Sequence, residues 1–478
     1  MRSAQRAGLA SAAALLLTGC TSFAAAVTTP DAASPTSTAD VPDDAGACPA
    51  ERARPDPDRP VVDLDFRLED DRATVTGTET VVFTPDRTVD RLVFRLVPNG
   101  PDSAPNGNRL VVDDVRGDDV AEGGYEAAGA ADPGGLYVVP LEEELKAGNS
   151  TEVELAFTLA LGSGGFDRFG TDEGVSWWAS GAPLLAWEPG IGWADDSFVE
   201  LSGETASSPV MDTSVTVSAP ADLTVLMTGA RAQPSAVQDG RRTWRSAEKV
   251  ARDVGVAAGL FTTAEATTPD GVGVTVGVLP GAELPAALLA ERTTAAITAL
   301  EAHVGAFPYR TLTVALLPGH GGGIEYPSMI FEATPDPQVL VHEVAHMWFY
   351  GMVGNSQFRD PWLDEAFASW AETVVDGERG LVDQPAISLE GPVGGSMADY
   401  DDNRSYFTLV YDKGGAALLA ARQAAGADPF DAAIRCYVDA NAWTIATPED
   451  VYAVLSDMPA ALDPLIAAQA LGKDDVPR

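Results

Sequence analysis

The feature that most constrains the fold of this chain is a pair of histidines, His342 and His346, four positions apart. Asp336-Pro337 precedes them, and this order is typical of an N-cap followed by the first helical residue, which predicts a helix over residues 337–351. Side chains four positions apart lie on one helix face, so both imidazoles can bind the same ion. Glu343 follows His342, where its carboxylate can reach a water beside the ion without being a ligand.

Two histidines leave a catalytic zinc site incomplete, because such sites usually have three protein ligands and one position for water. Asp360-Pro361 predicts a second helix, over residues 361–377. Glu365 follows His346 with 18 residues between them, which is enough for a turn and an antiparallel helix. The alternative, two ordinary polar histidines on a half-buried helix, makes H-E-x-x-H a coincidence in a chain with 4 histidines. We therefore predict one Zn²⁺ bound by His342, His346 and Glu365.

The segment around the third ligand extends this pattern. It reads Trp362-Leu363-Asp364-Glu365-Ala366-Phe367-Ala368, and together with H-E-x-x-H-x18-E it resembles the aminopeptidase N family of zinc metallopeptidases (peptidase family M1), which has W-L-N-E-G-F-A here. Thermolysin-type endopeptidases typically space the third ligand one residue further. Asp364 and Ala366 replace the family's Asn and Gly, and Met347 stands where Gln is common, but none of these positions is a ligand.

A glycine-rich segment, Gly321-Gly322-Gly323-Ile324-Glu325-Tyr326-Pro327, lies upstream of the histidines. Taken alone, it reads as a turn before an edge strand, where glycines let the backbone approach a ligand and an extended peptide can pair. It also resembles the family's G-x-M-E-N exopeptidase motif, in the G-G-M-E-Y-P variant with Ile324 in place of Met. The resemblance implies that Glu325 binds the substrate's amino terminus, with Gly322 and Gly323 beside the substrate.

A tyrosine motif lies downstream, in a helix expected over residues 405–424. Tyr411-Asp412-Lys413-Gly414 resembles the family's Y-x-K-G, whose tyrosine hydroxyl donates a hydrogen bond to the oxyanion of the tetrahedral intermediate. The alternative is a tyrosine that packs on the core of an amphipathic helix. Tyr406, one turn earlier, fits the family position less well.

Upstream of the motifs, the sequence predicts an antiparallel β domain over residues 61–265, because apolar and polar residues alternate in short runs separated by Gly, Pro and Asp. Trp177, Trp178, Trp187 and Trp193 are expected to pack in the core or between domains. The family uses an acidic or amide residue of this domain to bind the substrate's amino group, and Glu188 and Glu204 are candidates. The clearest runs are Val61–Leu68, Ala73–Phe83, Leu92–Leu96, Val153–Leu161 and Ser214–Ser218.

Residues 266–478 are expected to form the catalytic domain. The resemblance implies an α+β multidomain protein in which the N-terminal antiparallel β domain precedes a thermolysin-like zincin domain, in a short form without the family's large helical C-terminal domain. The predicted elements are strands at Val274–Val278 and Thr311–Leu317 and helices at Ala286–Val304, Pro429–Val438 and Pro448–Ser456.

The first 60 residues predict export rather than a folded domain. Residues 1–20 read as a signal peptide that ends in Leu17-Thr18-Gly19-Cys20, which resembles a bacterial lipoprotein box with Cys20 lipidated. We therefore expect a protein anchored by lipid to the extracytoplasmic face of the cell membrane, and the alternative is secretion after cleavage at Ala24-Ala25-Ala26. Residues 21–60, rich in Ala, Thr, Ser, Pro and Asp without periodicity, are expected to be a disordered tether.

Charge and cysteine content restrict the partners further. A net charge of −41 repels phosphate backbones, so no nucleic-acid partner is expected. Its simplest role is solubility, and a second is attraction of cationic peptides. Outside the cytoplasm Cys48 and Cys436 could pair or remain separate buried thiols, and the sequence does not decide between the two.

The resemblance implies a zinc-dependent aminopeptidase that acts on peptides, with Glu343 as general base and Tyr411 as oxyanion donor. Two alternatives remain at this level: a zinc endopeptidase with an open cleft, and a non-catalytic lipoprotein that binds peptides. The sequence leaves open the preferred N-terminal residue, the physiological substrate and the oligomeric state.

Overall fold

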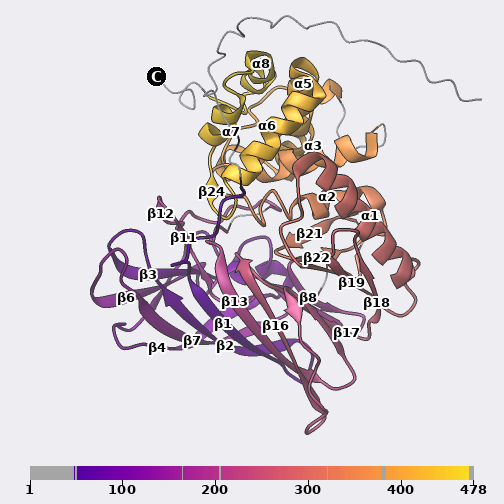
Figure 1. Ribbon diagram of the computed structural model, residues 1–478. Coiled ribbons are helices and arrows are strands. Elements are labelled where there is room, and N and C mark those ends of the chain that lie inside the picture. Colours follow the sequence, from indigo (N-terminus) through magenta and orange to yellow (C-terminus); the bar gives the residue numbers. More distant parts are fainter. Residues whose placement is uncertain are drawn as a thin grey trace, which may run out of the picture. The chain divides into compact units, whose positions relative to one another are not determined.

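The computed structural model describes Cys48 and residues 51–163, 165–203, 206–319, 321–377 and 384–472 (Figure 1). All of them belong to one compact unit, Gly46–Arg478. The predicted signal peptide, Cys20 and most of the predicted tether lie outside the described residues. In the part of the chain that is described, no helix is long and apolar enough to cross a membrane.

The first part of the described chain is built from β-strands. A seven-stranded sheet has the order β15-β16-β13-β1-β2-β7-β4, and smaller sheets have the orders β10-β3-β6-β5, β14-β17-β9-β8 and β11-β12. The strands are β1 (Val61–Leu68), β2 (Thr74–Phe83), β3 (Val89–Arg95), β4 (Arg109–Arg116), β5 (Gly124–Glu126), β6 (Leu136–Leu145), β7 (Thr151–Ala160), β8 (Phe169–Asp172), β9 (Val175–Ala179), β10 (Leu184–Leu185), β11 (Trp187–Glu188), β12 (Gly192–Trp193), β13 (Met211–Pro220), β14 (Thr224–Met227), β15 (Ala230–Arg231), β16 (Arg241–Ala251) and β17 (Gly255–Gly259). The 3₁₀ turns η1 (Val97–Asn99) and η2 (Ala104–Asn106) follow β3.

The alternation seen in the sequence determines which face of the large sheet is buried. In β1 every second side chain, from Val62 to Leu68, is buried and the others are exposed, as expected for a strand with one face on the core. All five predicted runs are confirmed as strands. The pairing differs in one place from a purely antiparallel domain, because β1 pairs antiparallel with β2 but parallel with β13.

The tryptophans of the β part fill its interior, which confirms their expected packing role. Trp177 and Trp178 are at most 1% exposed, and Trp187 is 3% exposed. The Trp178 ring packs edge-on against Phe66 at a centroid distance of 5.8 Å. Trp193 is half-buried and packs against Trp187 at 4.8 Å.

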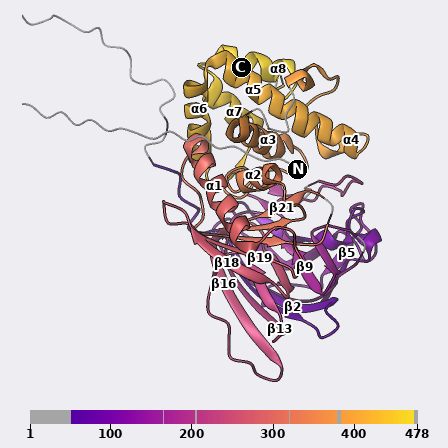
Figure 2. The same ribbon diagram turned by 90° about the vertical axis from the view of Figure 1, so that its right-hand side faces the viewer.

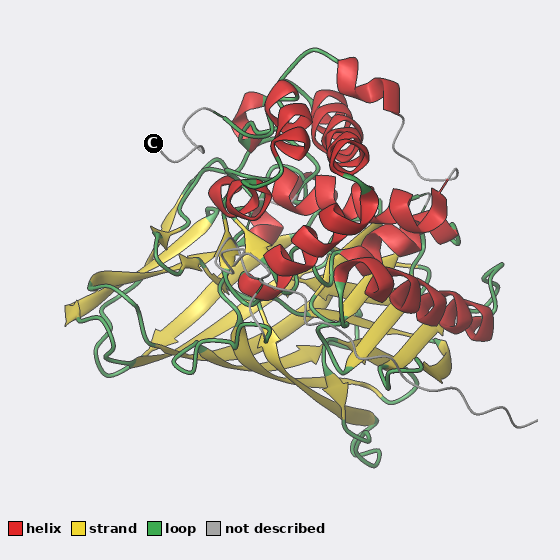
Figure 3. Cartoon of the chain, turned by 45° about the horizontal axis from the view of Figure 1, so that its top comes forward, coloured by secondary structure: helices red, strands yellow, loops and turns green. Residues whose placement is uncertain are grey.

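The second part begins with β18 (Thr262–Thr267), before the expected boundary at residue 266, and contains a sheet in the order β18-β19-β20-β22-β21. Its other strands are β19 (Gly273–Val278), β20 (Thr311–Leu316), β21 (Gly323–Tyr326), β22 (Met329–Glu332), β23 (Gly354–Asn355) and β24 (Ile445–Ala446). Its helices are α1 (Ala286–Val304), α2 (Pro337–Ala345), α3 (Trp362–Asp376), α4 (Asn403–Tyr406), the π-helix η6 (Phe407–Lys413), α5 (Gly414–Ala425), α6 (Ala427–Ala440), α7 (Pro448–Leu455) and α8 (Pro459–Ala467), with 3₁₀ turns η4 (Gln384–Ser388) and η5 (Met397–Asp399). Figure 2 shows α1 beside β18 and β19, and Figure 3 shows the helices gathered on one side of the strands.

Two helices around the motifs differ from the expected lengths. The first stops at Ala345 rather than continuing to Gly351, because the backbone tightens after it and Tyr350 adopts φ 100°. The helix expected over residues 405–424 is divided into α4, η6 and α5. Five-residue backbone spacing in η6 changes which side chains share a face, and periodicity of 3.6 does not predict such a segment.

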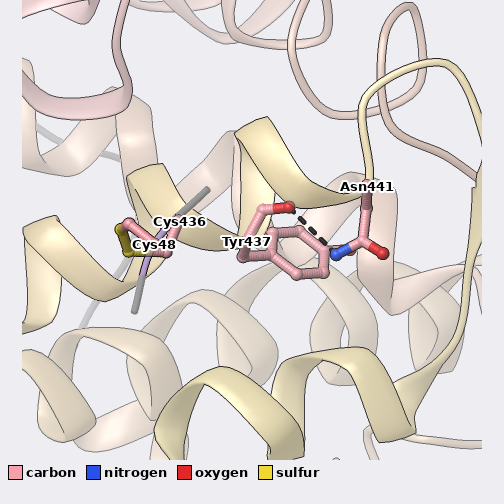
Figure 4. The surroundings of a disulfide bond; sticks show 4 residues. All are labelled: Cys48, Cys436, Tyr437 and Asn441. Atoms are coloured by element: carbon pink, nitrogen blue, oxygen red, sulfur yellow. Dashed lines mark hydrogen bonds between the residues drawn. A yellow bond between two sulfur atoms is a disulfide. The ribbon is translucent and has the colours of Figure 1, made fainter. Parts of the chain in front are cut away.

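Residues 51–60 were expected to belong to the disordered tether, but they are ordered and form a strap that joins the helices of the second part to β1. Cys48 forms a disulfide with Cys436 of α6 (Figure 4), which settles the question that the sequence left open. Ala53 N donates to Asp439 O at 2.8 Å, and the Arg52 guanidinium contacts the Asp439 carboxylate at 2.8 Å. The strap therefore follows α6 before the first strand begins.

Two arginines, one buried and one partly exposed, connect the β part to loops of the second part. Arg252, which is 3% exposed, donates to Ser208 O at 2.8 Å and Thr444 O at 3.1 Å. Arg359, just before α3, forms ion pairs with Asp196 at 2.9 Å and with Glu188. Arg252 Nε also donates to Gly351 O, after α2, at 3.5 Å, so the two arginines hold the segments after α2 and before α3 against the β domain.

Candidate active site

The two histidines lie on α2, as the sequence predicts. Asp336 caps this helix, because its carboxylate accepts a hydrogen bond from Gln338 N at 3.0 Å and Pro337 occupies the first turn. His342 and His346 lie on one helix face, with ring centroids 4.8 Å apart. Their exposed fractions are 8% and 1%, so both rings face the interior.

Helix α3 brings the third predicted ligand to this face. Glu365 Oε2 lies 3.3 Å from His342 Nε2 and 3.3 Å from His346 Nε2. The candidate ligand atoms of the three residues all lie within 4.8 Å of one another. The 18-residue spacing thus brings the carboxylate back to the histidines, as expected.

The geometry of this triad fits a zinc ion. Zinc bonds to nitrogen and oxygen of about 2.0–2.1 Å in a tetrahedral arrangement place neighbouring ligand atoms about 3.3 Å apart.

The pKa shifts of the three side chains also favour a cation at this position. Burial raises the pKa of Glu365, but both imidazoles outweigh it and hold that pKa well below its usual range. Burial lowers the pKa of His342, yet hydrogen bonds with Glu365 and Glu372 raise it to about 10. The site therefore favours positive charge between these side chains.

A carboxylate orients each imidazole. His346 Nδ1 lies 2.6 Å from Asp364 Oδ1, and His342 Nδ1 lies 3.5 Å from Glu372 Oε2. Such contacts leave each Nε2 directed at the ion and are typical of histidine ligands. Glu325, His346 and Asp364 also form a set of close donor atoms, but Asp364 already contacts Nδ1 of His346, so the triad with Glu365 is the better metal site.

Glu372 was not predicted from the sequence. It lies seven positions after Glu365 on the same helix, a spacing that returns a side chain to the same face after two turns. This spacing was the available signal. The side chain is fully buried, and its nearness to His342 accounts for a carboxylate at this position.

The predicted base, Glu343, lies in the interior beside Gly323. It is 5% exposed, and its Oε2 has no hydrogen-bond partner among the described residues. A Cβ on Gly323 would lie 2.4 Å from Glu343 Cγ, so only glycine leaves room for this side chain. Burial raises the pKa of Glu343 to about 8, although His342 lowers it.

Glu325 lies on β21, close to the same cluster. It is 4% exposed, its Oε1 lies 3.9 Å from His346 Nδ1, and burial raises its pKa. Gly322, at φ 83°, and Gly323 precede it and line the same cavity. The structure therefore brings the glycine-rich segment to the histidines, as the sequence predicts.

Tyr411 reaches the site from the π-helix η6. Its ring stacks on His342 with a centroid distance of 5.9 Å and an interplanar angle of 7°. Tyr406, five positions earlier, packs edge-on against Tyr411 at 5.7 Å. Tyr406 is the last residue of α4, and η6 begins at the next residue, so the π-helix carries Tyr411 to His342 while Tyr406 packs behind it.

All predicted site residues line one cavity of about 420 Å³. The second part contributes the glycine-rich segment, both histidines, the two glutamates of the zinc motif and Tyr411, with Ile324, Val339 and Phe407 beside them. The β part contributes Asp102, Phe166, Asp167, Arg168, Ser202 and Gly203. No sequence pattern indicated this second group, because loops of the β domain carry it.

The two candidates for a β-domain residue that binds the amino group differ in outcome. Glu188 is buried in an ion pair with Arg359 and is not among the residues that line the cavity. Glu204 lies outside the described residues.

A pair of helices that brings two histidines and a glutamate together, joined to a five-stranded sheet, is typical of zinc metallopeptidases. Within this class, residues 332–385 match the family model for the peptidase family M1 domain. The matched segment spans the end of β22, α2, α3 and the loop between the helices.

Curated relatives match only a part of the chain. It is 25% identical over 151 residues to aminopeptidase M1-B of Oryza sativa subsp. japonica, a match that covers 28% of this chain and 17% of the relative. It is 28% identical over 136 residues to aminopeptidase N of Lactobacillus helveticus, covering 25% and 16%. The match thus spans about a sixth of the length of these relatives.

Solved structures cover much more of the chain. The M1 zinc metallopeptidase of Deinococcus radiodurans has a TM-score of 0.64 at 18% identity, over 88% of this chain and 95% of that chain. A mutant of the Deinococcus radiodurans enzyme bound to a Tyr-Ser-Ala substrate gives 0.63 at 18% identity, over 88% and 96%. The chain therefore shares the M1 metallopeptidase fold across both parts.

Proposed function

We propose that this protein is a zinc-dependent aminopeptidase that removes N-terminal residues from peptides. The observation that carries the proposal is the convergence of His342 Nε2, His346 Nε2 and Glu365 Oε2 at 3.3 Å contacts. Glu343 and Glu325 line the same cavity. A metal triad, a buried base and an amine-binding carboxylate form the set that hydrolysis of a terminal peptide bond requires.

Glu343 is the general base in this proposal. It takes a proton from the attacking water and delivers it to the leaving amine. Burial raises the pKa of Glu343, and a cation bound beside it would lower that pKa and keep the carboxylate able to accept a proton. When bound by the triad, zinc would polarise the scissile carbonyl and make the attacking water more acidic.

Glu325 and Tyr411 bind different groups of the substrate, the α-amino group and the oxyanion. Glu325 binds the protonated α-amino group, which places the first peptide bond beside the triad. The Tyr411 hydroxyl donates a hydrogen bond to the oxyanion, a contribution of roughly 3 kcal/mol when such a donor is well placed. Gly322 and Gly323 let the substrate backbone lie close to β21.

The comparisons support this proposal. The curated relatives are aminopeptidases by name, and one structural neighbour is described as bound to a Tyr-Ser-Ala substrate. Peptides are the proposed partners.

A panel of fluorogenic aminoacyl substrates with N-blocked counterparts, assayed with and without a chelator, tests the activity. We expect hydrolysis of free-amine substrates only, loss of activity with chelator and recovery on addition of Zn²⁺. Equal cleavage of blocked and free substrates would indicate an endopeptidase. Peptide retention without turnover by zinc-loaded protein would indicate a binding protein.

We also propose that the protein acts outside the cytoplasm, held by a lipid on Cys20. The Cys48–Cys436 disulfide supports this location, because disulfides persist in oxidising compartments. The Leu17-Thr18-Gly19-Cys20 ending supports the lipid anchor. Mass spectrometry of the membrane fraction tests it: the N-terminal peptide should begin at lipidated Cys20, whereas a soluble protein cleaved after Ala26 would overturn the anchor.

A further inference from the structure

A three-residue segment of the β part, Leu201–Gly203, is built into the catalytic part, and we call it the 201–203 wall. Leu201 is 4% exposed and belongs to the hydrophobic core of the catalytic part. Gly203 lies so close to α4 that an added Cβ would be 2.9 Å from Tyr406 Cε1 and 2.9 Å from Met397 Cε. Leu201 thus anchors the wall in the core of the catalytic part, and Gly203 is in close contact with Tyr406 and Met397 of that part.

Hydrogen bonds join the middle residue of the wall to helix α4 of the catalytic part. Ser202 N donates to Asn403 Oδ1 at 2.7 Å, and Asn403 Nδ2 donates to Ser202 Oγ at 3.0 Å. Asn403 begins α4, where a capping box formed by Asp402 and Ser405 holds the backbone. The β domain and α4 are therefore clasped together beside the cavity that Ser202 lines.

The wall lies on the side of the cavity where the substrate's amino group would bind. Ser202 and Gly203 both line the cavity, and Ser202 Oγ donates to Asp102 Oδ1 at 3.1 Å. Burial lowers the pKa of Arg168, but the charges of Glu325 and Asp102 are among those that raise it. Arg168 lines the same cavity as Asp102, which lies beside the wall, and Glu325, the proposed amine-binding residue.

We propose that the 201–203 wall closes the cleft beyond the first substrate residue and thereby restricts the enzyme to free N-termini. This inference rests on the proposed aminopeptidase function and adds the element that excludes longer or blocked N-termini. Glu325 selects for charge, because it favours a protonated amine. The wall selects for size, because its backbone occupies the space into which a preceding residue or an acyl group would extend.

Three versions of one substrate separate these two effects. The first has a free α-amine, the second has hydrogen in place of the amine, and the third carries an N-acetyl group. Loss of the amine removes the contact with Glu325 but adds no bulk, whereas the acetyl group also meets the wall. In the native protein we expect kcat/KM to fall from the first substrate to the second, and at least tenfold further for the third.

The double variant Ser202→Ala/Asn403→Ala removes the clasp and leaves Leu201 in place. We expect kcat/KM for the acetylated substrate to rise at least tenfold relative to the des-amino substrate, with internal cleavage products of longer peptides detected by mass spectrometry. Asn441→Ala is the matched control, because Asn441 Nδ2 also donates one hydrogen bond, to Tyr437 O at 2.9 Å (Figure 4), and does not line the cavity. That variant should leave the ratio unchanged.

The outcomes distinguish a failure of the proposed role of the wall from a failure of the proposed aminopeptidase function. If the native protein cleaves the free-amine substrate and the double variant keeps the native ratio of acetylated to des-amino cleavage, with zinc content and melting temperature preserved, the wall has no such role. If acetylated and des-amino substrates are cleaved equally by the native protein, the wall is likewise refuted. If the zinc-loaded native protein cleaves no substrate, the proposed function itself fails. Ser202→Ala alone, the milder change, should shift the ratio in the same direction if the double variant does not fold.

Discussion

Two carboxylates at this site, those of Glu343 and Glu325, are buried, which is unfavourable for a charged group. Glu343 and Glu325 are at most 5% exposed, and each has a carboxylate oxygen without a hydrogen-bond partner among the described residues. A buried, unpaired carboxylate costs several kcal/mol in stability, so its presence here indicates function rather than packing.

Replacing Glu343 tests the base. Glu343→Gln should keep stoichiometric zinc and lower kcat by roughly 10²–10⁴-fold, because the amide keeps the shape but cannot accept the proton. Zinc content by metal analysis and steady-state kinetics are the two measurements. Turnover at the native rate in zinc-loaded protein would assign the base to another residue.

Replacing Glu325 tests recognition of the amine. Glu325→Ala should raise KM for free-amine peptides by about tenfold or more, because a charged hydrogen bond of roughly 1.5–3 kcal/mol is lost on binding. The des-amino substrate serves as the internal control, since its KM should not change. An unchanged KM for the free-amine peptide would remove Glu325 from this role.

At the scale of elements, α3 holds more of the metal site than its single ligand. Its first turn presents Asp364 and Glu365, and Glu372 follows two turns later on the same face. One helix therefore provides a ligand and the two carboxylates that orient both imidazoles of α2.

Glu372→Gln tests the orienting role. We expect the zinc dissociation constant to rise 10–100-fold, as is typical when the partner of a histidine ligand is lost. Competition with a chromophoric chelator measures it. Glu449→Gln, on an exposed position of α7, makes the same chemical change away from the site and should leave affinity unaltered; equal effects of both variants would count against the assignment.

A second element-scale contact joins α1, α5 and α6 outside the site. Asp431 contacts Arg422 at 2.6 and 2.9 Å and His303 Nδ1 at 3.1 Å. Burial raises the pKa of Asp431, but hydrogen bonds from Arg422 and His303 outweigh it and lower that pKa. A lowered folded-state pKa stabilises the fold above the unfolded-state value of about 3.9, and this contribution is lost as the pH falls through the folded-state pKa.

Asp431→Asn should therefore lower the free energy of unfolding by roughly 2 kcal/mol at neutral pH. The difference from the native protein should shrink as the pH falls below about 4. Urea unfolding at several pH values measures both. Asp463→Asn, on an exposed position of α8, is the control, and a difference that stays constant with pH would contradict the linkage.

At the scale of the whole described unit, the two parts depend on each other. Residues of both parts line the cavity. Leu201 and Val250 of the β part lie in the core of the catalytic part. Cys48, which precedes the strap, forms a disulfide with Cys436 of α6. The site is therefore complete only when the β part and the catalytic part are joined.

Removing the Cys48–Cys436 disulfide tests how much this link to α6 contributes to the free energy of unfolding. Cys48→Ser/Cys436→Ser should lower the free energy of unfolding by roughly 5 kcal/mol, because the bond closes a loop of 388 residues in sequence separation. Reductant should lower the melting temperature of the native protein and not that of the variant. A native melting temperature that is insensitive to reductant would show that the strap adds no stability.

Much of the local structure followed from the sequence alone. Alternating residues predicted the β-strands, the Asp336 cap located α2, and helix α1 has its expected bounds. The Asp360-Pro361 signal placed α3 within one residue, but the N-cap position is Pro361 and not the expected Asp360. The grouping of His342, His346 and Glu365 followed as well, because motif spacing encodes local geometry. These features depend on neighbours within a few turns of backbone, so a linear pattern records them.

Only the tertiary structure decided what surrounds that centre. The π-helix that carries Tyr411, the parallel pairing of β1 with β13, the Cys48–Cys436 disulfide and the clasp between Ser202 and Asn403 all depend on segments that meet after folding. Contacts between residues hundreds of positions apart leave no periodicity or spacing to read. The sequence by itself therefore determined the chemistry at the centre, and the packing of the two parts decided the walls of the cavity in which that chemistry would act.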